Sequence, residues 1–299
     1  MSLFELNQEK KLQQREAQPP GAVHNPHEPE AQWAAKGHGK HRHEHVGYKI
    51  QVAETVKEVE LERGEPTQNF LTAVLTQDAI GSDEAGHLEV EHEQAAMGLE
   101  KASHLYVDGS YVSAEKLAQA QAEGRHLIGP AQHSPTREGK FSIEDFQIQV
   151  EERKAICPAG KTNTQCSRLE EEARGKVSYR FEFGAHCHQC ALSGQCVGAN
   201  QKHRTLVVGQ YHTHLQHRRQ EQKTEAFTQE SKKRNAIEGT NSELVRAHGM
   251  RRARYRGKAK VALQNHFIGA ACNAKRWIKR VIWELQHAQL GAKLSVASG

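Results

Sequence analysis

The sequence predicts an α/β fold with a partly parallel sheet. Two alternating apolar segments, residues 47–55 and 69–76, indicate an antiparallel pair of strands joined by a long polar loop. Helix, strand, helix and strand patterns follow in that order along the chain. Because a helix crosses between the later strands, those strands are expected to be parallel. The chain has 299 residues, enough for one large domain or two smaller ones.

The elements after the first strand pair are expected in the following order. Ser82 should cap a helix over residues 83–101, whose acidic first turn favours the helix dipole. A short buried strand over residues 104–107 then ends at Asp108. Ser113 should cap a helix over residues 114–123, which Gly124 ends. Residues 125–129 indicate another strand, parallel to the one before Asp108.

The pattern breaks between residue 135 and about residue 201, a segment that holds five of the six cysteines and short strand-like pieces. We interpret it as an insertion. Helical patterns return with a long helix over residues 221–247 and a second over 259–290, with a break near Cys272 and Asn273. The predicted organisation is a disordered or linker tail (1–45), a partial α/β core (46–134), a Cys-rich insertion (135–219) and C-terminal helices (220–299).

Charge is distributed unevenly. Residues 201–299 contain 20 Lys and Arg against 6 Asp and Glu, a net +14, and the remainder has 21 against 30, a net −9, which together give +5. A basic C-terminal third is expected for a polyanion partner, and the alternative is a solvated basic face without a ligand. No apolar run approaches the roughly 20 residues of a membrane span, and the start lacks a signal-peptide core, so a cytoplasmic protein is expected.

The cysteines indicate a structural zinc site. Cys187, Cys190 and Cys196 form a C-x2-C-x5-C pattern, and Cys157 supplies the fourth thiolate of a tetrahedral site. A metal-free reduced cluster is the alternative. Competing ligands are Cys166, His186 and His188.

Two carboxylates stand in settings that suit a divalent metal held against a phosphodiester. Asp108 follows the apolar residues 105–107, and ligands bind beyond the carboxyl ends of strands in open α/β sheets. Glu238 lies on a basic helix one turn after Arg234. Their oxygens suit Mg²⁺ or Mn²⁺. The alternative interpretations are a turn-capping aspartate at Asp108 and a surface ion pair between Arg234 and Glu238.

A basic block follows this helix. Residues 251–260, RRARYRGKAK, hold six basic side chains, which can clamp phosphates, and Tyr255 can stack on a base. With Arg234, the expected DNA-contacting residues are Arg251, Arg252, Arg254, Arg256 and Lys258.

The segment YVDGSYVSAEKL around Asp108 resembles the second-acid motif of the DDE transposases of bacterial insertion sequences. The segment RNAIEGTNSELVRAHGMRRARYRG around Glu238 resembles their third-acid block. Arg234 and Glu238 match the family's Tyr-x2-Arg-x3-Glu signature, with Ser231 at the Tyr position. The resemblance covers roughly residues 25–285. It implies a ribonuclease-H-like mixed sheet flanked by helices, with Asp108 and Glu238 binding Mg²⁺ or Mn²⁺ for DNA cleavage and strand transfer.

The family's first acid is expected on a strand before residue 47, yet residues 1–46 contain no matching Asp-Ser/Gly-Thr setting. Glu28 and Glu30 lie there, and neither is assigned as catalytic. The resemblance thus implies the C-terminal part of a catalytic domain whose first strand is missing. Such a chain would be inactive alone, would act with an upstream N-terminal transposase polypeptide, and would form a homo-oligomer. The alternative function is a non-enzymatic, basic, zinc-containing nucleic-acid-binding protein.

Overall fold

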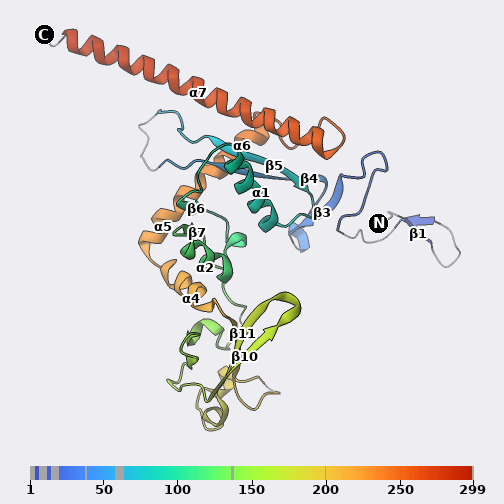
Figure 1. Cartoon of the computed structure of the whole chain (residues 1–299), viewed down its shortest axis with the longest axis vertical. Helices are drawn as coiled ribbons and strands as arrows, with labels where there is room; N and C mark the ends of the chain where they lie inside the picture. Colours follow the sequence, from blue (N-terminus) through green and yellow to red (C-terminus); the bar gives the residue numbers. More distant parts are fainter. Residues whose placement is uncertain are drawn as a thin grey trace. The chain divides into compact units, whose positions relative to one another are not determined.

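The computed structural model describes residues 4–6, 12–14, 20–37, 39–57, 64–135, 138–198 and 200–297 (Figure 1). The chain forms two compact units, one from residues 1–101 with 234–299 and the other from residues 102–233. The boundaries of these units differ from the predicted ones. Residues 46–134, predicted as one core, are divided between the two units after residue 101. Much of the predicted tail, including residues 7–11 and 15–19, lies outside the described residues.

The sheet of the first unit is antiparallel, in the order β3 (Gln32–Lys36), β4 (His43–Glu54) and β5 (Leu71–Asp78). The predicted pairing of the last two strands is confirmed. The expected disordered or linker tail over residues 1–45 is wrong where β3 forms, because QWAAK pairs with the start of β4 and buries Trp33. A short hairpin of β1 (Phe4–Leu6) and β2 (Leu12–Gln14) stands apart from this sheet. The predicted polar loop after β4 lies partly outside the described residues, at 58–63.

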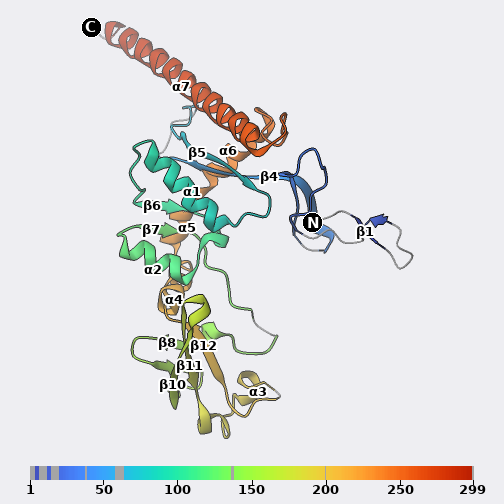
Figure 2. The same ribbon diagram turned by 45° about the vertical axis from the view of Figure 1, so that its right-hand side comes forward.

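Helices cover both faces of this sheet (Figure 2). Helix α1 (Asp83–Ala96) begins at Ser82, whose hydroxyl accepts a hydrogen bond from the Ala85 backbone at 3.0 Å, as predicted. It ends five residues early, because the chain turns at Gly98, where φ is +75°. Val90 packs on one face of β5, and the opposite face packs against α6 (Asn235–Arg246) and α7 (Lys258–Ala297) through Val74, Leu244, Met250 and Cys272.

Helix α7 is continuous over 40 residues, so the predicted break near residue 272 is wrong. Asn273 does not interrupt the helix. Its side-chain amide donates to the Leu71 carbonyl and accepts from the Leu71 N–H, each at 2.9 Å, which satisfies the backbone at the start of β5. Gly269 lets the helix approach the sheet closely, since a Cβ there would lie 2.8 Å from Val74.

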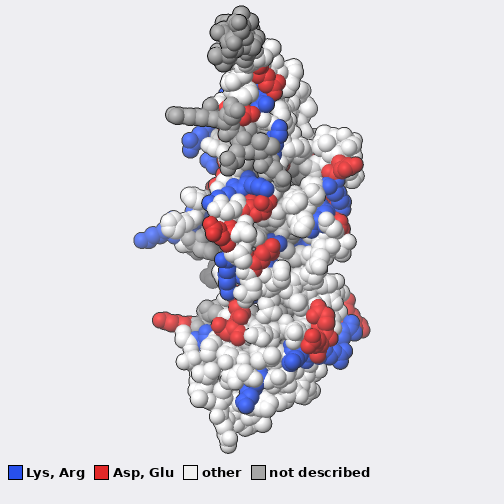
Figure 3. Space-filling view, turned by 90° about the vertical axis from the view of Figure 1, so that its left-hand side faces the viewer, with Lys and Arg blue, Asp and Glu red and all other residues white. Residues whose placement is uncertain are grey.

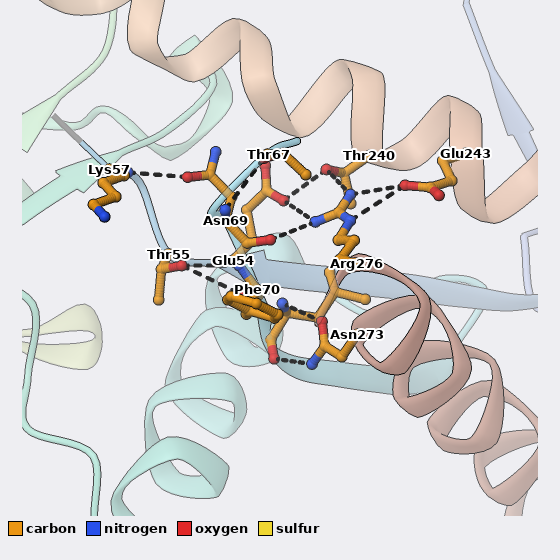
Figure 4. A network of polar contacts seen from close by, with 11 residues as sticks. Glu54, Thr55, Lys57, Thr67, Asn69, Phe70, Thr240, Glu243, Asn273 and Arg276 are labelled. Atoms are coloured by element: carbon orange, nitrogen blue, oxygen red, sulfur yellow. Dashed lines mark hydrogen bonds and ion pairs between the residues drawn. The ribbon is translucent and has the colours of Figure 1, made fainter. Parts of the chain in front are cut away.

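A buried ionic network fastens α6 and α7 to β4 (Figure 4). The Arg276 guanidinium donates to Glu54 at 3.2 Å, to Glu243 at 3.0 and 3.2 Å, and to the Thr240 hydroxyl at 2.7 Å. The Thr240 hydroxyl donates to Glu54 at 2.6 Å. The side chains of Arg276 and Glu54 are only 5% and 2% exposed. Lys275 pairs with Glu243 at 2.9 Å, so two cations balance two carboxylates.

The second unit begins with a parallel pair, β6 (His104–Tyr106) and β7 (His126–Ile128), joined by α2 (Ala114–Ala122). The predicted parallel strands and the Ser113 cap, which accepts from the Lys116 N–H, are confirmed. The predicted single helix over residues 221–247 is wrong. It is divided into the end of α4 (His212–Glu221), α5 (Glu225–Ser231) and α6, because Thr224 caps a new helix and residues 232–234 form a 3-10 turn.

The Cys-rich segment has its own apolar core, built on short antiparallel strands. Buried Phe146, Phe181 and Phe183 occupy its centre, with several cysteines packed against them. Its elements are β8 (Gln147–Gln149), β9 (Lys154–Ile156), β10 (Gln165–Glu171), β11 (Lys176–Glu182), α3 (Ser193–Cys196) and β12 (Thr205–Gly209).

The mixed α/β class is confirmed. Among the described residues, the antiparallel sheet and the parallel pair are separate sheets, so a single ribonuclease-H-like sheet remains a prediction. The described helices include none that is both long and apolar enough to span a membrane.

Replacing Arg276 with alanine should lower the free energy of unfolding by about 3–5 kcal/mol, because Glu54 would stay buried without its cation. Arg42→Ala is the control, since its partner Glu44 and Arg42 itself are about half exposed, and its loss should be about 0–1 kcal/mol. Urea unfolding followed by circular dichroism measures both. Equal losses for the two variants would show that the buried network is not specially stabilising.

Acid should weaken the same network. Burial acts to raise the pKa of Glu243, but hydrogen bonds and charge from Lys275 and Arg276 outweigh it and lower the pKa from 4.5 to about 2. The stabilisation is therefore complete above pH 4.5 and is lost as pH falls toward 2. Unfolding curves of the native chain and Glu243→Gln should converge over that range. A constant difference between them at every pH would contradict this assignment.

Candidate functional site

Asp108 lies where the sequence predicts it, directly after β6. Its carboxylate accepts a hydrogen bond from the Gly109 N–H at 2.5 Å and caps a 3-10 turn over Gly109–Tyr111. The residue is exposed, while Val107 and Gly109 on either side are buried. A Cβ on Gly109 would lie 2.9 Å from the Pro130 carbonyl oxygen, so the loop after β7 packs closely here. One carboxylate oxygen is thereby oriented by the backbone beside a rigid strand end.

Glu238 lies in the first turn of α6, where a carboxylate is favoured by the helix dipole. Its side chain is 63% exposed and pairs with Arg234 at 3.1 Å. The surface ion pair between Arg234 and Glu238, given above as the alternative interpretation, is present. Ser231, at the Tyr position of the signature, donates its hydroxyl to the Thr228 carbonyl.

The two acids belong to different units, Asp108 to the second and Glu238 to the first. Each is presented on a defined element and each is exposed. Their convergence on one metal ion stays a prediction.

The basic block forms a hollow of about 430 Å³ on the first unit. Gln264 of α7 holds its loop by accepting from the Arg254 N–H and donating to the Arg252 carbonyl, each at 2.8 Å. Arg246 and His248, which sequence patterns did not single out, join two of the predicted residues there. The charged and ionisable lining residues are Arg246, His248, Arg252 and Arg254.

Other members of the block are arranged differently. Arg251 and Arg256 are exposed beside the hollow. Lys258 pairs with Asp78 at 3.0 Å, and its backbone N–H donates to Glu30 at 2.8 Å, so its charge is already partnered. Glu28 accepts from the Tyr48 hydroxyl at 3.1 Å. Glu28 and Glu30 thus fasten the N-terminal segment to Tyr48 and to the start of α7.

All four predicted zinc ligands line one small cavity of about 20 Å³, room for about one water-sized probe. Backbone N–H groups point at two of the sulfurs, Lys161 to Cys157 at 3.4 Å and Arg204 to Cys187 at 3.5 Å. His186 also lines the cavity, whereas the competing Cys166 and His188 do not. Burial raises the pKa of the Cys196 thiol, Arg204 opposes the rise, and the three other cysteines add to it. The cysteines of the cavity are Cys157, Cys187, Cys190 and Cys196.

The sulfurs of the cavity do not lie as close together as the ligands of one metal ion. Among the described residues, Glu243, His248 and Cys272 each offer a ligand atom within 4.8 Å of the other two. No three of the cavity sulfurs lie that close to one another. Glu243 is already neutralised by Lys275 and Arg276, so this second cluster offers a cation little net negative charge. Cys272, expected to be a core residue, is fully buried.

On the face shown in Figure 3, basic and acidic side chains are interspersed over the described residues. The positive surplus of the last third is therefore not a continuous field on that face. Several basic side chains are instead grouped at the hollow formed by residues 246–254.

Residues 156–278 match the family model of the transposase DDE domain. The match supports the assignment of this chain to the DDE transposases, the class that the motifs around Asp108 and Glu238 indicate. No curated protein and no solved structure shows a significant match.

The matched range bears on the predicted organisation. It includes Arg234, Glu238, the basic block and the four cavity cysteines, and it begins after Asp108. The Cys-rich segment from residue 156 onward thus falls inside the matched domain.

Proposed function

We propose that this chain carries out metal-dependent cleavage and strand transfer of DNA, with Asp108 and Glu238 as two of its metal-binding carboxylates. The observation that carries the proposal is the presentation of both acids on ordered elements with exposed oxygens, in a chain assigned to the DDE transposases. The family match favours this function over a non-enzymatic nucleic-acid-binding protein.

The donor set fits Mg²⁺ or Mn²⁺, since both ions prefer carboxylate oxygens and keep water and phosphate as other ligands. When bound, such ions activate the attacking oxygen and stabilise the leaving oxygen of a phosphodiester. Asp108 retains an oxygen beyond the one held by Gly109. Arg234, beside Glu238, would orient a phosphate and limit repulsion between that phosphate and the carboxylate.

Metal position can be tested separately from turnover. Fe²⁺ substituted for Mg²⁺ and treated with peroxide and ascorbate should cut the backbone near both Asp108 and Glu238. Excess Mg²⁺ should suppress the cuts, and Asp108→Asn should weaken them at both segments because the ion is shared. Asp145→Asn, an acid that caps a turn in the Cys-rich segment, is the control. Cuts near one acid alone, or cuts unchanged in Asp108→Asn, would refute a shared metal site.

The hollow at residues 246–254 is proposed to hold the DNA backbone. Arg246, Arg252 and Arg254 are arranged around one concave surface and suit phosphate oxygens. Such contacts carry no sequence information, and each releases counterions from DNA.

DNA affinity should therefore fall steeply with salt and vary little between sequences. Arg252→Ala should reduce the slope of log affinity against log salt by about 0.9, the value for one phosphate contact. Lys36→Ala, at the exposed end of β3, should leave the slope unchanged. Fluorescence anisotropy on two unrelated duplexes measures both properties. Salt-independent binding, or a strong preference for one duplex, would contradict backbone recognition.

The four-cysteine cavity is proposed to hold structural zinc. Thiolates at a tetrahedral centre suit this ion, and N–H groups directed at sulfur stabilise the thiolate form. The cavity sulfurs lie farther apart than metal ligands do, so a bound ion would draw them together from that wider spacing.

Purified native chain should contain close to one zinc ion, and Cys190→Ser should lose most of it. Cys166→Ser is the matched control, because Cys166 lies in the same segment outside the cavity. Metal content by plasma mass spectrometry decides between the outcomes. A native chain without zinc, or equal loss in both variants, would exclude the site.

A further inference from the structure

Helix α7 leaves several large apolar residues exposed. Its buried side is mixed: Val261 and Cys272 lie in the core, together with the polar Gln264, Asn265 and Arg276. On the other side, Leu263 is 57% exposed, Phe267 68%, Ile278 50%, Ile282 49% and Leu285 59%. In an ordinary surface helix, a large apolar stripe of this kind faces the core.

The exposed apolar residues form one continuous stripe. With about 3.6 residues per turn, their spacings of three and four keep them on one side of the helix over about 33 Å. No polar residue interrupts the stripe, and its middle is made of small residues. We define the α7 stripe as Leu263, Phe267, Ala271, Ala274, Ile278, Ile282 and Leu285.

Within the first unit, nothing among the described residues covers this stripe. Figures 1 and 2 show α7 continuing well beyond the strands of its own unit. Single exposed apolar residues are normal on a protein surface, but a contiguous strip of several large ones marks an interaction site.

We propose that the α7 stripe binds the same stripe of a second copy of this chain, with the two helices antiparallel. The order of side-chain sizes is nearly the same from either end. In an antiparallel pair centred between residues 272 and 273, Leu263 would face Ile282, Phe267 would face Ile278, and Ala271 would face Ala274. A two-fold contact requires this kind of self-complementary surface, and an unrelated partner does not.

The sizes of the side chains also fit close helix packing. Ala271 and Ala274 let the two backbones approach at the centre, while the larger residues toward both ends interdigitate. These features together make a second copy of α7 the best-matched occupant.

The surrounding charges permit the contact. Lys275 is paired with Glu243, and Arg280 is paired with Glu284 and Glu65, so these cations near the stripe are compensated within each copy. Lys279 lies about 100° around the helix from Ile278. Between Leu263 and Ile282, two copies can therefore join without bringing uncompensated like charges into the apolar stripe.

Sedimentation of the full chain over a range of concentrations tests the inference. The native chain should form a dimer, and Phe267→Glu or Ile278→Lys should each weaken it by at least about tenfold, because a charge would be buried. Lys279→Glu, on the same helix outside the stripe, is the control and should leave dimerisation unchanged. Circular dichroism checks that each variant folds.

The antiparallel register has its own test. An equimolar mixture of Phe267→Glu and Ile278→Lys chains should regain dimers, since the two introduced charges would face one another. Phe267→Cys and Ile278→Cys chains should likewise form a disulfide, identified by mass spectrometry of the linked peptides, only when mixed. A monomeric native chain, or stripe variants that dimerise like the control, would overturn the inference. Cross-linking by each cysteine variant alone would overturn the antiparallel arrangement.

Discussion

The buried Arg276 guanidinium is the interaction on which the first unit depends. It joins α7 to β4 through Glu54 and to α6 through Thr240 and Glu243 (Figure 4). Burying charged groups costs several kcal/mol per ion unless each is paired and hydrogen-bonded. Arg276, Glu54 and Glu243 are paired with one another, while Oε1 of Glu54 is buried without a hydrogen-bond partner. The network therefore fixes the positions of α6 and α7 relative to β4. If its members shift, α6 loses its fixed position on the sheet, and Glu238 moves with it.

The candidate functional groups are exposed but rest on constrained backbone. Glu238 protrudes from a helix whose other side is fixed by Thr240 and Leu244. The arginines of the basic hollow sit on a loop that Gln264 holds by two hydrogen bonds. Asp108 caps its own turn at the end of β6. In each case the rigid partner is buried and the reactive or charged atom faces solvent, which suits a large polyanionic substrate.

The Cys-rich segment and α7 differ in how they bury their apolar side chains. The Cys-rich segment packs three phenylalanines at its centre and gathers four thiols at one edge, where a metal ion would close the structure. Helix α7 instead packs a mixed face, with Val261, Cys272 and Arg276, on the rest of the first unit and leaves large apolar residues exposed on its other side.

Local sequence determined much of the fold and several candidate residues. The caps at Ser82 and Ser113, the strand pairing of β4 with β5, and the parallel strands beside Asp108 all follow from short-range patterns of apolar spacing and hydrogen-bonding side chains. The C-x2-C spacing likewise pointed to the cysteines that share a cavity. These features depend on residues close together in the chain, so periodicity and capping chemistry are sufficient to predict them.

Only the tertiary structure decided the rest. The pairing of QWAAK as β3 depends on an edge offered by β4, and Asn273 is tolerated within α7 because it satisfies the distant Leu71 backbone. The partners of Arg276 lie 33 to 222 positions away, and no local pattern distinguishes this arginine from the exposed ones nearby. Burial and long-range pairing are properties of packed surfaces, which a single sequence does not encode as a local signal.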